Sequence, residues 1–181
     1  MRAPVLVVVT GMPSSGKTTV AEAVSRKLSL PLIAKDEIKE RLYERLGVGD
    51  VAWSGRLGAA AYDLIFQIAE TMLAAGMSLI VEANFFRDQQ SVFASLSRHR
   101  LVQIHCDAPL HVLLDRYASR DRHAGHHDAE KINELPARHA SGAHAPLELD
   151  GVLVQLDTAG EIDLDELAQL VRAHVSGSAV A

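Results

Sequence analysis

The sequence has 181 residues, of which 48% are hydrophobic, and carries 18 basic and 23 acidic residues for a net charge of −5. This length predicts one domain over residues 1–181 with a substantial core, and the mild acidity gives no electrostatic reason to expect general nucleic-acid binding. The single cysteine, Cys106, excludes an internal disulfide, and no apolar run reaches the length of a signal peptide or a membrane span, so we expect a cytoplasmic protein.

The first predicted element is a buried strand, Val5–Thr10, which runs into a loop of small residues. The loop, Gly11–Thr18, reads GMPSSGKT and matches the pattern G-x-x-x-x-G-K-[ST] at every position. Glycines let the backbone wrap around phosphate oxygens, and a helix predicted over Lys17–Leu28 would point its positive dipole end at the same phosphates. The motif therefore predicts a site for a nucleoside triphosphate, with a chance glycine loop as the alternative.

Residues of this loop have individual tasks if the nucleotide is ATP with Mg²⁺. Lys17 supplies a mobile cation for the β- and γ-phosphates, and the Thr18 hydroxyl is the predicted Mg²⁺ ligand. The other predicted phosphate-binding residues are Gly11, Pro13, Ser14, Ser15, Gly16 and Thr19.

Asp36 follows the second predicted strand, Pro31–Ala34, almost directly. Parallel α/β sheets bind ligands beyond the carboxyl ends of their strands, and an alcohol acceptor needs a carboxylate to orient its hydroxyl or accept its proton. Asp36 is therefore the candidate base, while a role as N-cap of a helix over Glu37–Leu46 is the alternative, and both roles are compatible. Lys39, one turn further, either faces the same cleft and binds the acceptor or is solvated.

The segment Gly47–Gly58 is rich in glycine, and we expect a flexible flap that contacts the acceptor. Tyr43 and Trp53 lie between the second predicted strand and the long helix, where an aromatic ring either stacks on a substrate or packs in the core, and packing is favoured. A long helix follows and ends at Gly76, because apolar residues recur at three-to-four spacing at Leu57, Ala61, Leu64, Ile65, Ile68 and Met72.

Glu82 ends the third predicted strand, Ser78–Glu82, beside the glycine loop. A carboxylate at this position would bind a Mg²⁺-bound water or the acceptor hydroxyl, and the alternative is a buried carboxylate whose hydrogen bonds are satisfied within the fold. Asn84 is a weaker candidate for contact with the acceptor. This strand lacks the terminal aspartate typical of motor ATPases, and the chain lacks the N-K-x-D motif that reads guanine, so a kinase is favoured over a motor or a switch.

Arg116 and Arg120 lie four residues apart on a helix predicted over Pro109–Ser119, after a strand at Leu101–Cys106. Arginines of this kind stabilise the charge of a transferring phosphoryl group, and the alternative is a pair of solvent-exposed arginines beside Asp115 and Asp121.

The segment of about residues 120–146 is polar and carries five of the nine histidines, so we expect a long loop that acts as a lid. Its H-x-x-H-H spacing is compatible with zinc, but phosphoryl transfer needs no zinc and no thiolate accompanies the histidines, so a polar lid or a solvated loop is favoured. No single histidine is assigned a role. A last strand, Val152–Asp157, and a helix, Leu164–Val175, complete an alternating pattern that predicts a parallel sheet with helices on both faces.

Several stretches together resemble one known family: GMPSSGKTT, KDEIK, VEANF, HCDAPLHVLLDRYASR and LVQLDT. The sequence is similar to small P-loop kinases that include polynucleotide 5′-hydroxyl kinases, chloramphenicol phosphotransferase and zeta-toxin-like kinases. The resemblance implies a three-layer P-loop fold of the nucleoside-monophosphate-kinase-like type, with a lid and a parallel five-stranded sheet in the order 2-3-1-4-5.

The resemblance also implies residue roles. Asp36 matches the family's general base, Arg116 and Arg120 match lid arginines, and Glu82 with Asn84 occupies the place of a pair that faces the acceptor. Lys39 stands where polynucleotide kinases have an arginine that touches a phosphate of the acceptor, which counts against a nucleic-acid substrate.

From these observations we expect an enzyme that uses ATP and Mg²⁺ to phosphorylate a hydroxyl of a small molecule such as a sugar, antibiotic or nucleoside. Asp36, Lys17, Arg116 and Arg120 are the expected catalytic residues. A kinase for the 5′-hydroxyl of a nucleotide or polynucleotide is the nearest alternative, and a regulatory module that binds ATP without transfer is an alternative of another class.

Overall fold

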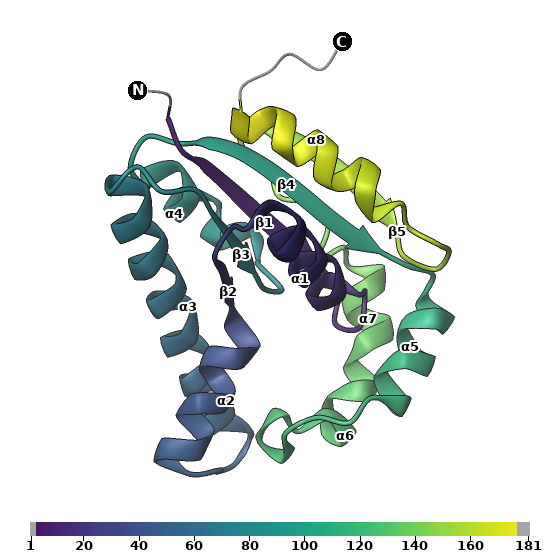
Figure 1. The fold of residues 1–181 in the computed structure, drawn as a ribbon. Helices are drawn as coiled ribbons and strands as arrows, with labels where there is room; N and C mark the ends of the chain where they lie inside the picture. The colour runs from purple at the N-terminus through teal and green to yellow at the C-terminus, as the bar shows by residue number, and fades with distance from the viewer. Residues whose placement is uncertain (1–2, 177–181) are drawn as a thin grey trace.

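The computed structural model describes residues 3–176, apart from the side chains of residues 129 and 130. Five parallel strands form one sheet in the order β2-β3-β1-β4-β5 (Figure 1). This confirms the parallel α/β fold that the sequence pattern predicts and the strand order that the family resemblance implies. The strands are β1 (Val5–Gly11), β2 (Leu32–Ala34), β3 (Leu79–Glu82), β4 (Arg100–Asp107) and β5 (Val152–Asp157).

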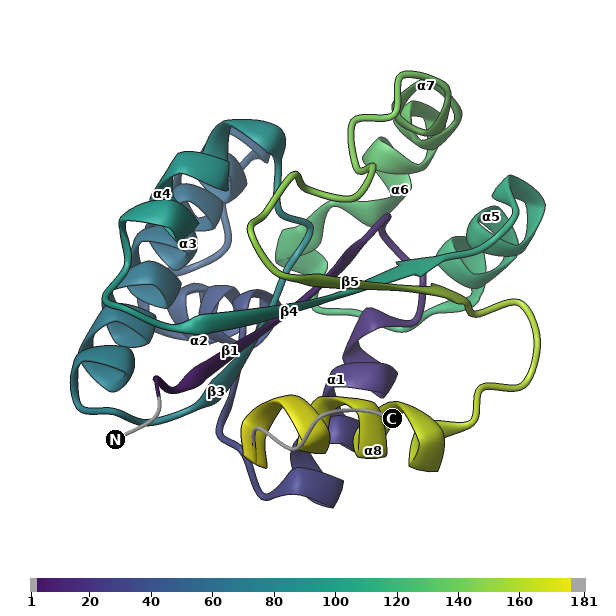
Figure 2. The same cartoon turned by 90° about the horizontal axis from the view of Figure 1, so that it is seen from above.

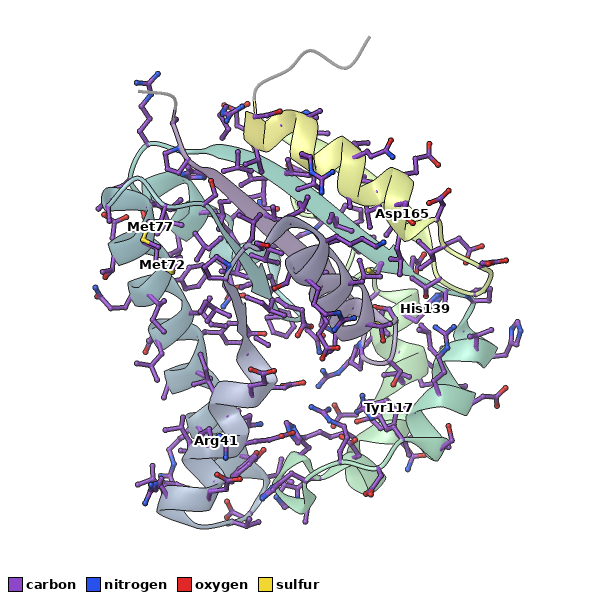
Figure 3. All side chains as sticks on the ribbon, viewed as in Figure 1. Arg41, Met72, Met77, Tyr117, His139 and Asp165 are labelled. Atoms are coloured by element: carbon purple, nitrogen blue, oxygen red, sulfur yellow. The ribbon has the colours of Figure 1, made fainter. Side chains whose placement is uncertain are left out.

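Helices cover both faces of this sheet, as Figure 2 shows: α1 (Lys17–Leu28) and α8 (Leu164–Ser176) lie on one face, and α3 (Val51–Ala74) and α4 (Gln90–Ser95) lie on the other. Alternate residues of a strand point to opposite faces. Val5, Val7 and Val9 of β1 therefore pack with α1 and α8, whereas Leu6 and Val8 pack with α3 and α4. The side chains of both layers fill the space next to the sheet (Figure 3), and this double cover explains why every residue of β1 is buried.

Two further helices and the lid lie beyond the carboxyl ends of the strands. These are α2 (Lys35–Leu46) and α5 (Leu110–Ser119), and the lid contains α6 (Asp128–Lys131) and α7 (Leu135–Ala140) with 3-10 turns at Ala124–His126 and Ile132–Glu134. The lid is therefore a chain of short helices rather than the long loop that its composition predicts. Leu135 anchors it, because this side chain is buried in a third apolar cluster with residues of α5.

Two local expectations are wrong. The glycine-rich segment does not form a flexible flap, because α3 begins at Val51, where the Asp50 side chain caps the helix by accepting a 2.7 Å hydrogen bond from the Trp53 amide. The valine- and leucine-rich sequence of the last strand is typical of a strand covered on both faces, but β5 is an edge strand, and its Val152 and Leu153 side chains are exposed. A 3-10 turn at Arg87–Gln89 and the short α4 escape sequence prediction altogether.

Candidate active site

The glycine loop joins β1 to α1 with a backbone that few residues other than glycine adopt. Gly11 has φ +143°, Gly16 has φ +78° and Ser14 has φ 64°. A Cβ atom at Gly11 would lie 2.0 Å from the carbonyl oxygen of Cys106 on β4. Gly11 therefore lets the loop turn immediately beside the neighbouring strand, which places the start of α1 at the carboxyl edge of the sheet.

Lys17 is the first residue of α1, and its side chain is buried against the glycine loop. Its Nζ donates a 2.7 Å hydrogen bond to the carbonyl oxygen of Met12, across the loop. Burial lowers the pKa of Lys17, although the carboxylates of Glu82 and Asp36 act in the opposite direction. The ammonium group is thus held at the place where the sequence predicts phosphates, in contact with the loop backbone.

A cavity of about 420 Å³ opens in front of this loop. Gly11 and Ser15 are buried and do not line it, and the Ser15 hydroxyl has no hydrogen-bond partner among the described residues. The other predicted phosphate-binding residues all line it, together with charged residues of α2, β3 and the lid entrance: Pro13, Ser14, Gly16, Lys17, Thr18, Thr19, Asp36, Glu37, Glu40, Glu82, Asn84, Arg116, Arg120 and Arg122.

The oxygen atoms on the wall of this cavity suit a hard cation such as Mg²⁺. Thr18 is exposed at the start of α1, and the carboxylates of Glu82 and Asp36 line the same cavity. Glu82 is buried and accepts no hydrogen bond from the described residues, so it is not the internally satisfied carboxylate of the alternative interpretation. Burial raises the pKa of Glu82 to about 7, although Lys17 opposes the rise.

Asp36 lies in the first turn of α2, where two cations hold its carboxylate. The helix begins at Lys35 and its N-cap is Ala34, so the interpretation of Asp36 as an N-cap is wrong. Its oxygens accept a 3.1 Å hydrogen bond from Lys35 Nζ and a 2.5 Å hydrogen bond from Arg122 Nη2. Burial alone would raise the pKa of Asp36, but Lys35 and Arg122 outweigh it and hold the pKa well below its usual range. Asp36 is therefore ionised at neutral pH.

Arg116 of α5 and Arg120, the C-cap of this helix, have different partners. Arg120 Nη1 donates to the hydroxyl of Ser14 in the glycine loop at 3.1 Å, and Arg120 also pairs with Asp128 of the lid. Arg116 donates to the hydroxyl and carbonyl oxygens of Thr158 at 3.1 and 2.6 Å, and Thr158 in turn donates to the carbonyl oxygen of Ser15. Both arginines are half-buried, which argues against the alternative of a freely solvated pair.

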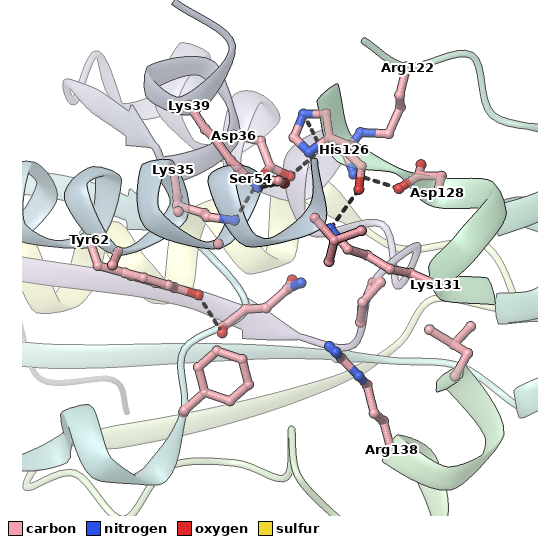
Figure 4. Close-up of a pocket in the computed structure, with 18 of the residues that line it drawn as sticks. Lys35, Asp36, Lys39, Ser54, Tyr62, Arg122, His126, Asp128, Lys131 and Arg138 are labelled. Carbon is pink, nitrogen blue, oxygen red and sulfur yellow. Dashed lines mark hydrogen bonds and ion pairs between the residues drawn. The ribbon is translucent and has the colours of Figure 1, made fainter. Parts of the chain in front are cut away.

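A second cavity, of about 480 Å³, lies next to the first between α2, α3 and the lid (Figure 4). Lys39 lines it and is only 5% exposed, and its Nζ donates a 2.9 Å hydrogen bond to the Ser54 hydroxyl, so the solvated alternative for this lysine does not hold. Five residues line both cavities: Pro13, Asp36, Asn84, Arg120 and Arg122. Asp36 therefore lies at the junction, within reach of both spaces.

Tyr43 and Trp53, the two aromatic residues predicted near the acceptor, pack within the fold. Tyr43 is buried, its hydroxyl lies 2.7 Å from the Ser54 hydroxyl, and it donates to the carbonyl oxygen of Gly125 in the lid. Trp53 lies outside the lining and donates from its ring nitrogen to the carbonyl oxygen of Gly47 at 3.0 Å. Packing is thus the role that the structure gives to both rings.

Two of the lid histidines, His123 and His126, contact α2. The His123 ring stacks on Tyr43 with centroids 5.1 Å apart, and His126 Nε2 lies 2.9 Å from a carboxylate oxygen of Glu40. Burial and the neighbouring Arg122 lower the pKa of His126 to about 4, so its ring is neutral at pH 7. Among the described residues, no group of three or more His, Cys, Asp or Glu side chains is arranged to bind a metal ion.

Three residues that shape the site were not predicted from the sequence: Lys35, Asp128 and Thr158. Thr158 carried a usable signal, because it follows β5 directly at the carboxyl edge of the sheet. Lys35 carried a weaker one as the neighbour of Asp36. The contacts of Arg122 with Asp36 and of Asp128 with Arg120 depend on how the lid folds back, which no local pattern reports.

Solved structures with a similar fold include kinases. A candidate kinase from Chloroflexus aurantiacus is 35% identical, with a TM-score of 0.87 over 96% of this chain and 99% of the other. A sugar kinase from Janibacter sp. and the shikimate kinase from Acinetobacter baumannii share the fold at TM-scores of 0.64 and 0.55. They are 19% and 14% identical, and each alignment covers 98% of this chain and 96% of the other.

Curated relatives are more distant. Uncharacterised proteins of Mycobacterium bovis and Mycobacterium tuberculosis are 27% identical over 146 residues, which is 75% of this chain but 29% of theirs. The chain therefore spans less than a third of the length of these relatives. A cytidylate kinase from Pyrobaculum islandicum is 41% identical over 44 residues, which is 24% of each chain. The family model described as an AAA domain matches residues 6–141. With most of its length covered by this model and its site built around the glycine loop, the chain belongs to the AAA domain family and, within it, to the small P-loop kinases.

Proposed function

We propose that this protein transfers the γ-phosphoryl group of ATP to a hydroxyl group of a small molecule. The observation that carries the proposal is the position of Asp36 at the junction of two cavities, one of which is lined by the glycine loop. The triphosphate occupies the cavity in front of Lys17, and the acceptor occupies the cavity between α2, α3 and the lid. The hydroxyl of the acceptor then lies beside the Asp36 carboxylate.

Each charged group has a role in this reaction. The acceptor oxygen forms a bond to the γ-phosphorus, the bond between that phosphorus and the β–γ bridging oxygen breaks, and ADP leaves. Ionised Asp36 orients the hydroxyl and accepts its proton as the new bond forms. Lys17 and Arg120 stabilise the charge on the transferring group, and Arg116 fixes the adjacent Thr158 turn.

Mg²⁺ would be held by the Thr18 hydroxyl, with Glu82 near enough to bind a water of its shell, and it would neutralise charge on the phosphates. Asn84 lies with Asp36 on the wall shared by the two cavities, and we assign it to positioning the acceptor.

No helix of the described residues is long and apolar enough to cross a membrane.

A screen for ADP release tests this function. ATP and Mg²⁺ are combined with sugars, nucleosides, antibiotics of the aminoglycoside and phenicol classes, and small alcohols, and product formation is verified by ³¹P NMR. We expect ADP release that depends on one acceptor class and that falls at least 100-fold in Lys17→Ala. ATP binding without a phosphorylated product from any class would favour the regulatory module instead.

The second candidate is a kinase for the 5′-hydroxyl of a nucleotide or polynucleotide. The lysine and arginine side chains around the acceptor cavity favour it, because they suit an acceptor that carries phosphate. Adding a short oligonucleotide and nucleoside monophosphates with free 5′-hydroxyls to the same screen decides between the two candidates.

A further inference from the structure

The acceptor cavity carries more positive charge than the chain as a whole would suggest. The protein has a net charge of −5, yet six cations and three carboxylates line this cavity. The three carboxylates belong to Asp36, Asp88 and Asp128. The six cations belong to Lys35, Lys39, Arg120, Arg122, Lys131 and Arg138.

Most of these cations already have a carboxylate partner. Lys35 and Arg122 pair with Asp36, and Arg120 pairs with Asp128. Arg138 pairs with Glu134 of the lid at 2.6 Å. These four side chains therefore do not by themselves require a ligand.

Lys39 and Lys131 are different, because neither forms an ion pair with any carboxylate of the described residues. Lys39 Nζ donates to the Ser54 hydroxyl at 2.9 Å, and Lys131 Nζ donates to the carbonyl oxygen of His126 at 2.7 Å. Each ammonium group has three hydrogens, so both retain the capacity to donate to a ligand. One lysine comes from α2 and the other from the lid, and Figure 4 shows both beside the same cavity.

Their environment disfavours the charge that they carry. Lys39 is 5% exposed, and a buried ammonium group without a counter-ion is unfavourable. Burial and the nearby Lys35 and Lys131 lower the pKa of Lys39 to about 8. Burial and Lys35 also lower the pKa of Lys131. A bound anion would relieve the repulsion at both lysines at once.

The cavity has room for a ligand beside these lysines. Gly55 and Gly58 of α3 line it, and a Cβ atom at Gly55 would meet nothing within 4 Å. A Cβ atom at Gly58 would lie 3.7 Å from Lys39 Nζ, so this glycine leaves the approach to the ammonium group open. The segment that the sequence suggested as a flexible flap is instead a helix whose glycines leave space in the cavity.

We propose that the acceptor is an organic anion, whose carboxylate or phosphate binds between Lys39 of α2 and Lys131 of the lid while its hydroxyl lies at Asp36. This inference rests on the proposed phosphoryl transfer and narrows its acceptor to hydroxyl compounds that carry negative charge. Because one lysine belongs to the lid, the same anion also joins the lid to α2.

Calorimetric titrations with matched ligands test the site. The protein is first saturated with Mg²⁺ and a non-hydrolysable ATP analogue, so that added anions do not bind at the glycine loop. Glycerol, glycerate and glycerol 3-phosphate form one series, and glucose, gluconate and glucose 6-phosphate form another. We expect anionic members to bind at least 10-fold more tightly than the neutral member. The anion with the higher affinity, carboxylate or phosphate, identifies the group that the site prefers.

Three variants make the titrations specific. Lys39→Gln and Lys131→Gln should each weaken binding of the anions at least 10-fold and leave the affinity for the ATP analogue unchanged. Lys27→Gln removes the same charge on α1, where Lys27 pairs with Asp165, and should behave as the wild type. Lys131 is half-buried on the lid, so its variant remains informative if Lys39→Gln folds poorly.

The outcomes separate this site from the proposed function. Equal affinity for neutral and anionic members, or anion binding that both lysine variants leave intact, overturns the anion site. If a neutral acceptor is phosphorylated with the same KM in wild type and Lys39→Gln, the kinase stands and the anion site falls. If anions bind in a Lys39-dependent way but no acceptor releases ADP, the site stands and the kinase proposal falls.

Discussion

At the scale of single residues, Glu82 places a protonation equilibrium near neutral pH. Burial raises its pKa from the ordinary 4.5 to about 7. The folded protein therefore binds more protons than the unfolded chain between these values, and the free energy of unfolding falls as the pH rises through this interval. A glutamine at this position mimics the protonated form and removes this source of pH dependence.

We expect Glu82→Gln to be more stable than the wild type at pH 8, by about 3 kcal/mol, since the pKa rises from 4.5 to about 7 and each unit of pKa corresponds to about 1.4 kcal/mol. At pH 5 the two proteins should differ little. Urea unfolding at both pH values measures this, with the exposed Glu148→Gln as the control that keeps the wild-type pH dependence. If the free energy of unfolding depended on pH in the same way in the wild type and in Glu82→Gln, the raised pKa of the buried Glu82 carboxylate would be contradicted.

Gly11 is the residue on which the loop conformation depends most. Gly11 has a positive φ, and a Cβ atom added there would lie 2.0 Å from a backbone oxygen. Gly76 also has a positive φ, of +76°, but a Cβ atom added there would meet nothing within 4 Å. Gly76→Ala should destabilise the fold by about 1 kcal/mol from backbone strain alone. Gly11→Ala should cost about 3 kcal/mol, because steric overlap adds to the strain. Urea unfolding measures the loss of stability in both variants. Equal losses would show that the space between Gly11 and β4 does not restrict the residue at position 11.

At the scale of elements, Tyr43 connects α2, α3 and the lid. Its hydroxyl contacts the Ser54 hydroxyl and the carbonyl oxygen of Gly125. Tyr43→Phe removes both contacts and should destabilise the fold by about 1 kcal/mol. Because Gly125 belongs to the lid, amide exchange across residues 120–141 should accelerate more than exchange in the sheet.

Tyr62→Phe is the matched control for the lid. The Tyr62 hydroxyl also donates to a backbone carbonyl, that of Asn84, but it makes no lid contact of this kind. Hydrogen exchange measured by mass spectrometry should therefore show a faster lid in Tyr43→Phe only. Similar lid exchange in the two variants would mean that Tyr43 does not hold the lid.

Sequence patterns predicted the central elements well because these elements are defined locally. Val5–Val9 of β1 is a continuous apolar run, and the glycine pattern that begins at Gly11 is specific to phosphate binding. The start of α3 was missed, because the glycines near Gly55 obscured a helix that Asp50 caps. The lid helices were missed because their apolar anchors, such as Leu135, are too few to give a periodic pattern.

At the scale of the whole molecule, the candidate site depends on contacts between distant parts of the chain. Asp36 and Arg122 are 86 residues apart in the sequence, and Lys39 donates a hydrogen bond to Ser54 of another helix. The place of Asp36 after a strand could be predicted from the sequence, but Arg122, one of the two cations that hold its carboxylate, is brought there by the packing of the lid on α2. The two cavities that meet at Asp36 exist only in the folded chain.

The most direct test of the central claim is phosphoryl transfer from γ-labelled ATP by Asp36→Ala, measured beside the wild type with the acceptor that the screen identifies. Asp36→Asn, which keeps an oxygen acceptor without the charge, accompanies it, and calorimetry records ATP·Mg²⁺ binding for all three proteins. We predict that both variants bind ATP within about threefold of the wild type but transfer phosphate at least 100-fold more slowly. Transfer by Asp36→Ala at the wild-type rate would contradict the assignment of the reaction to this junction.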